Sequence, residues 1–99
     1  MAFESLVGLN VIDPEGYQRY RDGMSPILAR YGGGFRYDFV IGQTLKAEAS
    51  HPITRVFTIY FPDRASNDAF FADPEYRKIR ETHFNPAVNG ATVIAQYER

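Results

Sequence analysis

Two histidines are the side chains in this sequence best suited to proton transfer near neutral pH. His83 falls near the end of a predicted helix, where its imidazole could act as a general base, anchor a ligand or coordinate a metal. The favoured alternative is structural, because a histidine at a helix end interacts with the helix dipole and caps free carbonyl groups. His51 lies in a polar loop beside Pro52 and is expected to be solvated. No carboxylate stands at metal-ligand spacing from either histidine, so no metal site is expected.

A second group of candidates could line a ligand pocket. Arg55 alternates onto the same predicted strand face as Phe57 and Tyr37, and could bind a carboxylate among these rings. Its place near a strand end fits a solvent-exposed arginine equally well. Tyrosine hydroxyl groups could donate hydrogen bonds to an oxygenated ligand, whereas tyrosines on a helical stripe are more often core residues. The predicted pocket between helices and sheet is lined by Tyr37, Arg55, Phe57, Tyr76 and His83.

Several common catalytic signatures are missing. The run Gly32–Gly34 follows a helix and precedes a strand, so it presents no helix N-terminus to a phosphate. Ser25 and Ser66 lack recognisable histidine and aspartate partners. The chain has no cysteine, which excludes a thiolate nucleophile, a thiolate zinc site and a disulfide. No cofactor is expected, and His83 is the only catalytic candidate.

The composition favours one small domain without a charged binding face. The 99 residues are one domain's length, and a single domain is expected over residues 1–99. The 44% apolar and 15% aromatic content can fill a modest core, with rings left for a pocket or an oligomer interface. The net charge of −1, without blocks of like charge, argues against nucleic acid and membrane partners. Since no signal peptide and no apolar run of about 20 residues is recognised, a cytoplasmic location is expected.

Alternation of apolar residues predicts four strands. They are expected at Phe3–Ile12, Phe35–Leu45, Thr54–Phe61 and Ala91–Tyr97. Because the alternation is continuous in the second strand, Tyr37 is expected on the face that Phe57 and Arg55 occupy in the third.

Helical spacing and capping residues predict two helices between these strands. The first begins at Asp13-Pro14 and ends before the glycine run, with a kink or a split expected just before Pro26. The second spans residues 64–83 and is expected to break near Asp73, where a second aspartate–proline pair stands. Asparagine, proline and glycine over residues 85–90 predict a loop.

The order β-α-β-β-α-β predicts an α+β, ferredoxin-like fold. Right-handed crossovers place both helices on one face of a four-stranded antiparallel sheet. Neither face of the predicted strands is purely polar, which favours packing of the open face against a second subunit by two-fold symmetry. The alternative is an ordinary exposed face with scattered apolar residues.

Four phrases resemble a known family through their order and spacing. They are Asp13 to Tyr17, Tyr31 to Gly33, Tyr60 to Asp63 and Ala69 to Tyr76. Together they resemble the domain-of-unknown-function family thirteen-thirty, of the dimeric α+β barrel superfamily, over nearly the whole chain. The resemblance implies a ferredoxin-like subunit and a homodimer in which two sheets form a barrel.

The sequence departs from the usual family pattern at two places. Glu48-Ala49 stands where the family commonly has Glu-Gly, and His83 stands where it often has an arginine. If that arginine binds an anion in relatives, His83 could replace it only when protonated. Relatives in the superfamily include cofactor-free monooxygenases, haem-degrading enzymes, isomerases and binding proteins, so the fold assigns no reaction. We expect a homodimeric binding protein or cofactor-free enzyme for a small oxygenated or aromatic metabolite; the alternative is a non-catalytic interaction or regulatory module.

Overall fold

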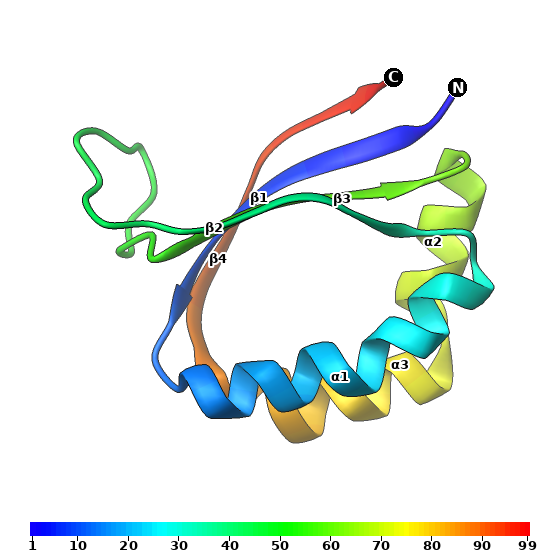
Figure 1. Cartoon of the computed structure of the whole chain (residues 1–99), viewed down its shortest axis with the longest axis horizontal. Coiled ribbons are helices and arrows are strands. Elements are labelled where there is room, and N and C mark those ends of the chain that lie inside the picture. The colour runs from blue at the N-terminus through cyan, green and yellow to red at the C-terminus, as the bar shows by residue number, and fades with distance from the viewer.

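The chain forms a four-stranded antiparallel sheet with its helices on one face, as the computed structural model of residues 1–99 shows (Figure 1). In chain order the elements are β1 (Phe3–Val11), α1 (Pro14–Arg30), β2 (Gly34–Val40), β3 (Arg55–Phe61), α2 (Arg64–Ala72), α3 (Pro74–Ile79), the π-helical turn η1 (Arg80–Phe84), α4 (Asn85–Ala87) and β4 (Val88–Glu98). The strand order is β2-β3-β1-β4, so β2 and β4 are the edges. This arrangement confirms the predicted ferredoxin-like fold. None of the helices combines the length and apolar character needed to cross a membrane.

Helix α1 begins at the predicted cap. The Asp13 carboxylate accepts a hydrogen bond from the amide of Gly16 at 3.1 Å, and Pro14 occupies the first turn, where its missing N–H costs no helical bond. Of the kink or split predicted just before Pro26, the split does not occur, and α1 continues as one helix that bends in its C-terminal half (Figure 1). Side chains are buried on both sides of the proline, so both halves are held against the sheet.

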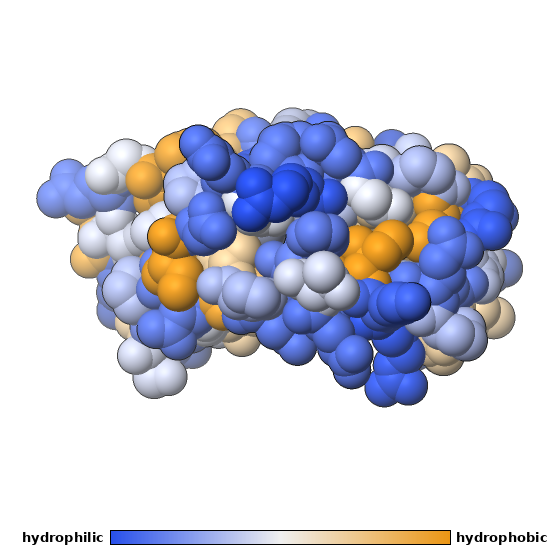
Figure 2. Space-filling model, turned by 90° about the horizontal axis from the view of Figure 1, so that it is seen from below, coloured by the Kyte–Doolittle hydropathy of each residue, from blue (hydrophilic) through white to orange (hydrophobic).

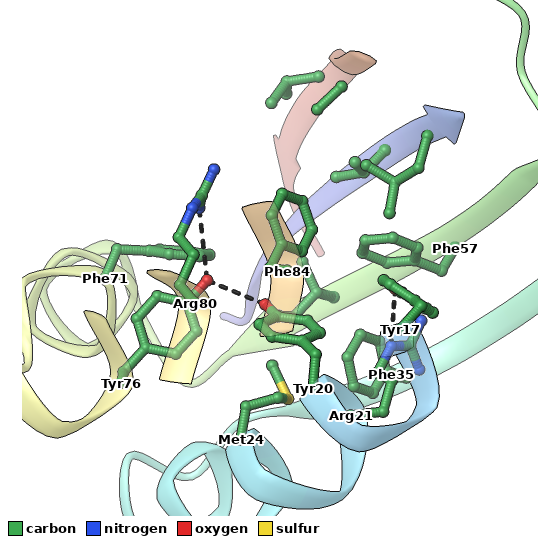
Figure 3. A pocket seen from close by; sticks show the side chains of 15 residues that line it. Tyr17, Tyr20, Arg21, Met24, Phe35, Phe57, Phe71, Tyr76, Arg80 and Phe84 are labelled. Atoms are coloured by element: carbon green, nitrogen blue, oxygen red, sulfur yellow. Dashed lines mark hydrogen bonds between the residues drawn. The ribbon is translucent and has the colours of Figure 1, made fainter. Parts of the chain in front are cut away.

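The second helical region breaks where the sequence predicts. Asp73 ends α2 and caps α3, because its carboxylate accepts hydrogen bonds from the amides of Glu75 at 2.8 Å and Tyr76 at 3.1 Å. The chain then widens into η1, which no sequence pattern predicted. This wide turn carries the side chains of Arg80 and Phe84 toward the sheet (Figure 3).

The strand boundaries differ from the prediction at both edges of the sheet. β2 ends at Val40, five residues before the predicted end, and residues 41–54 form the long loop to β3. β4 begins at Val88, because the predicted loop over residues 85–90 is instead the short helix α4 followed directly by strand.

The core lies between the helices and the sheet. Its rings are in tilted and edge-on contact; for example, the ring centres of Phe70 and Tyr76 lie 4.3 Å apart. The buried cluster comprises Leu9, Tyr17, Tyr20, Met24, Ile27, Leu28, Phe57, Ile59, Phe61, Phe70, Tyr76, Phe84 and Ala87.

A β-bulge in β2 changes the face on which its side chains lie. Phe35 pairs with Ile59, but the next pair along the ladder is Tyr37 with Thr58, which leaves Arg36 as an extra residue. Because side chains alternate along a strand, everything after the bulge lies on the face opposite to the predicted one.

The bulge overturns the predicted common face of Tyr37, Phe57 and Arg55. Phe57 lies on the helical side, whereas Tyr37 and Phe39 lie together on the open face, with ring centres 6.0 Å apart and each side chain 52% exposed. Asp38 turns inward instead, opposite Phe57. The open face of the sheet therefore carries aromatic rings that the prediction had assigned to the interior.

The open face also carries a fully buried carboxylate, that of Glu4 in β1. It accepts hydrogen bonds from Arg36 at 2.7 Å and from the Tyr97 hydroxyl, and Arg99 lies 3.3 Å away. Burial raises the pKa of Glu4, but the hydrogen bonds from Tyr97 and Arg36 and the charge of Arg99 outweigh it and lower the pKa overall. Glu4 is therefore a charged link between β1, β2 and β4.

His51 ties the loop of residues 41–54 to β4, contrary to the solvated position expected from the sequence. Its Nδ1 lies 2.7 Å from the carbonyl oxygen of Pro52, which can only accept, so Nδ1 carries a proton. Its Nε2 lies 2.7 Å from the Thr92 hydroxyl oxygen. The half-buried histidine thus joins the loop to an edge strand.

Substitution of Gly90 tests this link. Gly90 has a φ of 119°, and the His51 ring occupies the space that a Cβ would need. We expect Gly90→Ala to lower the free energy of unfolding by about 1–3 kcal/mol, since both the backbone and the ring must shift. Gly42→Ala is the control, because no atom lies within 4 Å of its Cβ position, and it should change stability by less than about 0.5 kcal/mol. Urea denaturation followed by circular dichroism measures both, and equal effects would contradict the proposed contact.

Candidate functional site

A cavity of about 130 Å³ lies between the sheet and the helices (Figure 3). All four strands contribute to it, as do α1, α2, α3 and η1, and 13 of its 15 lining residues are hydrophobic. The lining comprises Val7, Leu9, Tyr17, Tyr20, Arg21, Met24, Phe35, Phe57, Ile59, Phe71, Tyr76, Arg80, Phe84, Ala91 and Val93. Figure 3 shows the two charged members, Arg21 and Arg80, on opposite sides of the cavity.

Arg21 projects from α1 among aromatic rings. Its guanidinium carbon lies 3.8 Å from the ring centre of Phe35 and 4.9 Å from that of Phe57. Its Nε donates to the Tyr17 hydroxyl at 2.8 Å, and its Nη1 donates to Asp38 at 3.1 Å. The remaining nitrogen, Nη2, is buried and has no hydrogen-bond partner. One donor group of this buried cation is therefore unused.

Asp38 connects that arginine to a second one. Arg55 donates from Nε and from Nη2 to the two carboxylate oxygens, at 2.8 Å each, which is the bidentate geometry that suits guanidinium and carboxylate. These hydrogen bonds lower the pKa of Asp38; burial opposes them, and the charge of Arg21 adds to the lowering. The network joins α1, β2 and β3 beside the cavity.

The other side of the cavity carries two tyrosine hydroxyl groups and Arg80. The oxygens of Tyr20 and Tyr76 lie 2.9 Å apart, and Arg80 Nη1 donates to Tyr76 at 3.4 Å (Figure 3). The guanidinium carbon of Arg80 also lies 4.6 Å from the ring centre of Phe84. Burial, and then the neighbouring Tyr76, raise the pKa of Tyr20 well above its usual value, so Tyr20 is protonated at neutral pH.

A second, more polar hollow adjoins the cavity on this side. It has a volume of about 270 Å³ and is lined by Phe71, Tyr76, Arg77, Arg80, Glu81 and Asn85. Since Phe71, Tyr76 and Arg80 line both spaces, they form the boundary between the cavity and the outer hollow. On the helical side of the molecule, hydrophilic side chains cover most of the surface and leave only small, separate apolar areas (Figure 2).

The structure brings together two of the five residues predicted to line the pocket. Phe57 and Tyr76 lie in the cavity wall. Arg55 does not line the cavity but binds Asp38, which in turn binds Arg21 of the cavity wall. The predicted role of Arg55 in ligand binding stays a prediction. Tyr37 lies on the open face of the sheet because of the bulge, and His83 in η1 does not line the cavity.

Four polar residues of the wall were not among those predicted to line the pocket: Tyr17, Tyr20, Arg21 and Arg80. Tyrosines on a helical stripe were expected in the core, where Tyr17 and Tyr20 do lie, and both side chains also line the cavity. The spacing of Tyr17 and Arg21, four residues apart on one helix face, was the available signal. Nothing in the sequence marked Arg80, because its orientation depends on the π-helical turn.

This lining can hold a small molecule but offers it no proton acceptor of the usual kind. No histidine, aspartate or glutamate lines the cavity, and no cluster of three or more potential metal-ligating side chains occurs in the chain. The polar groups that face the ligand space are guanidinium and phenol donors. The arrangement is suited to binding and orienting an oxygen-bearing molecule.

Comparison with known families and structures gives a consistent result. The model of a family described as a domain of unknown function (DUF1330) matches residues 5–97, which confirms the resemblance drawn from the sequence. No curated protein matches the chain.

Solved structures show the same fold. A protein of unknown function from Rhodopseudomonas palustris superposes with a TM-score of 0.82 at 20% identity, over 99% of this chain and 82% of that chain. A dabb family protein with a ferredoxin-like fold from Mesorhizobium loti gives 0.67 at 14%, over 99% and 96%. A dimeric ferredoxin-like protein of unknown function from Jannaschia sp. gives 0.61 at 17%, over 100% of both chains. At these identities the similarity shows the fold alone.

The pH dependence of stability tests the Asp38 network. The pKa of Asp38 is lowered in the folded chain, so its ionised form stabilises the fold above the ordinary unfolded pKa of about 4. That contribution is lost as the pH falls through 4 toward the lower folded pKa. We expect Asp38→Asn to be less stable than the wild type at pH 7, and to lose less stability between about pH 5 and pH 3. Urea titrations at each pH measure this, and parallel pH profiles would contradict a role for Asp38.

Proposed function

The chain belongs to the DUF1330 family, and on that premise we propose that it binds a small, largely apolar metabolite with an oxygen-bearing group in the cavity beneath its sheet, as a homodimer. One domain over residues 1–99 and a cytoplasmic location, both expected from the sequence, are kept as parts of this proposal. Any cofactor-free reaction would need its base from the ligand or from water, since the cavity wall supplies none.

The observation that carries the proposal is that the cavity is open although aromatic residues surround it. Its volume of about 130 Å³ is close to that of an engineered apolar cavity of about 150 Å³ that binds benzene. A ligand of about one aromatic ring is therefore the size that fits. The hydroxyl and guanidinium groups on two sides of the cavity give such a ring an oriented position.

The small volume of the cavity also supports the alternative, a non-catalytic interaction module. Ligand pockets of drug-sized molecules usually exceed about 300 Å³, so this cavity admits only a small ligand. If the aromatic side chains fill the cavity in solution, no ligand can bind there, and the function would lie in the dimer itself. Ligand binding distinguishes the two proposals.

Support for the homodimer comes from the open face of the sheet. Tyr37 and Phe39 are each 52% exposed there, and Ile94 and Tyr97 are 49% and 37% exposed. Aromatic side chains grouped on one face are typical of an interface core. The similar Jannaschia protein is described as dimeric, and a two-fold contact would cover this face on both subunits.

Filling the cavity tests the binding proposal. Val93 lines the cavity and is 57% exposed, so a larger side chain can enter from its position without displacing a buried group. We expect the wild type to bind phenol or toluene, and Val93→Phe to weaken that binding at least about tenfold. Val40→Phe, at an exposed position outside the cavity, should bind as the wild type does. Titration followed by NMR measures both, and native mass spectrometry of freshly purified protein shows whether a natural ligand is already bound. Absence of binding by any aromatic probe would favour the interaction module.

Opposite faces of β2 allow a matched test of the dimer. Phe39 lies on the open face, and its neighbour Val40 lies on the other side and is 80% exposed. We expect Phe39→Glu to shift the protein from dimer to monomer, because the charge would be buried at the two-fold contact. Val40→Glu should leave the dimer intact. Light scattering after size-exclusion chromatography gives the mass, and a wild-type monomer would overturn the proposal.

A further inference from the structure

We infer that the ligand is a small monocarboxylate with an apolar body, and that Arg80 binds its carboxylate at the boundary between the cavity and the outer hollow. This inference rests on the proposed function and names the class of its ligand. It concerns a residue that neither the family resemblance nor the sequence singled out.

The first observation is that Arg80 has no counter-ion. Three arginines of the chain are buried or half-buried, namely Arg21, Arg55 and Arg80. Arg21 and Arg55 share the carboxylate of Asp38, whereas Arg80 forms no salt bridge. A half-buried cation beside an apolar space is costly unless an anion accompanies it. A ligand carboxylate would supply that anion.

The second observation is the place of Arg80. It lines both the apolar cavity and the outer hollow, so a carboxylate bound to it would lie at the mouth while the attached apolar group extends inward. Its guanidinium carbon lies 4.6 Å from the ring centre of Phe84, and one long hydrogen bond to Tyr76 uses one of its donors. Its remaining N–H groups are free for the planar, two-oxygen contact that carboxylates favour.

The tyrosine pair offers a further donor. Tyr20 and Tyr76 share one hydrogen bond, which uses one of their two hydroxyl hydrogens. Arg80 donates to the Tyr76 oxygen and uses neither hydrogen. Whichever tyrosine donates within the pair, one hydroxyl hydrogen stays available for a ligand oxygen. Both tyrosines line the cavity, so that hydrogen and the Arg80 fork can reach the same carboxylate.

The surrounding charges favour one negative group rather than two. Around the outer hollow, Arg77 adds a positive charge and Glu81 a negative one, so Arg80 is left as the net charge there. On the far side of the cavity, Arg21 shares the carboxylate of Asp38 with Arg55, and its guanidinium is held between the rings of Phe35 and Phe57, away from the outer hollow. At the outer hollow, a phosphate or a second carboxylate would bring a second negative charge, whereas Arg77, Arg80 and Glu81 leave only one net positive charge.

Two probes of equal shape test the inference. Benzoate and benzamide share one ring and one planar group, and differ in charge. Isothermal titration of the wild-type chain should show benzoate binding about ten- to a hundredfold more tightly than benzamide, which is the contribution expected of a charge-assisted hydrogen bond. Arg80→Gln should remove that difference and leave benzamide affinity within about twofold. Arg77→Gln is the control, since Arg77 lines only the outer hollow, and should retain most of the preference.

The outcomes separate this inference from the proposed function. If benzamide binds as well as benzoate, or if phenol binds and benzoate does not, the carboxylate inference is overturned and the cavity proposal stands. If no aromatic probe binds, the proposed function fails and the inference fails with it. Should Arg80→Gln not fold, Arg80→Lys keeps the charge but loses the planar fork, and a loss of benzoate affinity of at least about threefold supports the contact. An unchanged Arg80 Nε–H signal in the NMR spectrum on adding benzoate would overturn it.

Discussion

The carboxylate of Asp38 sets the position of helix α1 relative to the sheet, and the cavity depends on that position. Arg55 on β3 and Arg21 on α1 both donate to it, so a single anion joins a helix to two strands. Loss of Asp38 would leave the guanidinium of Arg21 buried among rings without a counter-ion, which costs far more than loss of a surface pair. The bulge at Arg36 is what turns Asp38 inward. One extra residue in an edge strand therefore places a carboxylate on the helical side of the sheet, beside the cavity.

The cavity persists because polar groups prevent its walls from closing. Protein interiors normally pack as densely as organic crystals, so an unfilled space among aromatic rings forfeits contacts that collapse would recover. Here Tyr20 on α1 and Tyr76 on α3 share a hydrogen bond, and Tyr17 accepts one from Arg21. Rotation of any of these rings into the space would break a buried hydrogen bond, and an unsatisfied buried hydroxyl costs more than the contact gains. These hydrogen bonds therefore keep the aromatic side chains from filling the apolar cavity.

The sequence predicted the elements and their caps well, because those depend on neighbours in the chain. Asp13 and Asp73 each bind an amide two or three residues ahead, which a local pattern can reveal. The bulge at Arg36 could not be predicted, since it arises where β2 pairs with β3, and the apolar alternation in the sequence of β2 runs through it without a break. The π-helical turn that orients Arg80 was equally hidden. Both features change which residues lie beside the cavity. Tyr37 lies on the open face instead of in the predicted pocket, and Arg80, which the sequence did not mark, lines the cavity.

Strand β4 links the two faces on which the proposed functions depend. Leu6 of β1 pairs with Ala95 and Val7 pairs with Val93, so Ile94 is an extra residue in a second bulge. Val93 lines the cavity, whereas Ile94 approaches Gly8 on the open face, where the second subunit is proposed to bind. Neighbouring residues of one edge strand thus belong to the ligand space and to the assembly surface. Because Val93 and Ile94 are consecutive residues at this bulge, a partner that contacts Ile94 would also restrict the backbone that carries Val93. A subunit contact and a filled cavity would then stabilise the same backbone conformation, which gives a physical reason for this fold to combine dimer formation with binding of a small ligand.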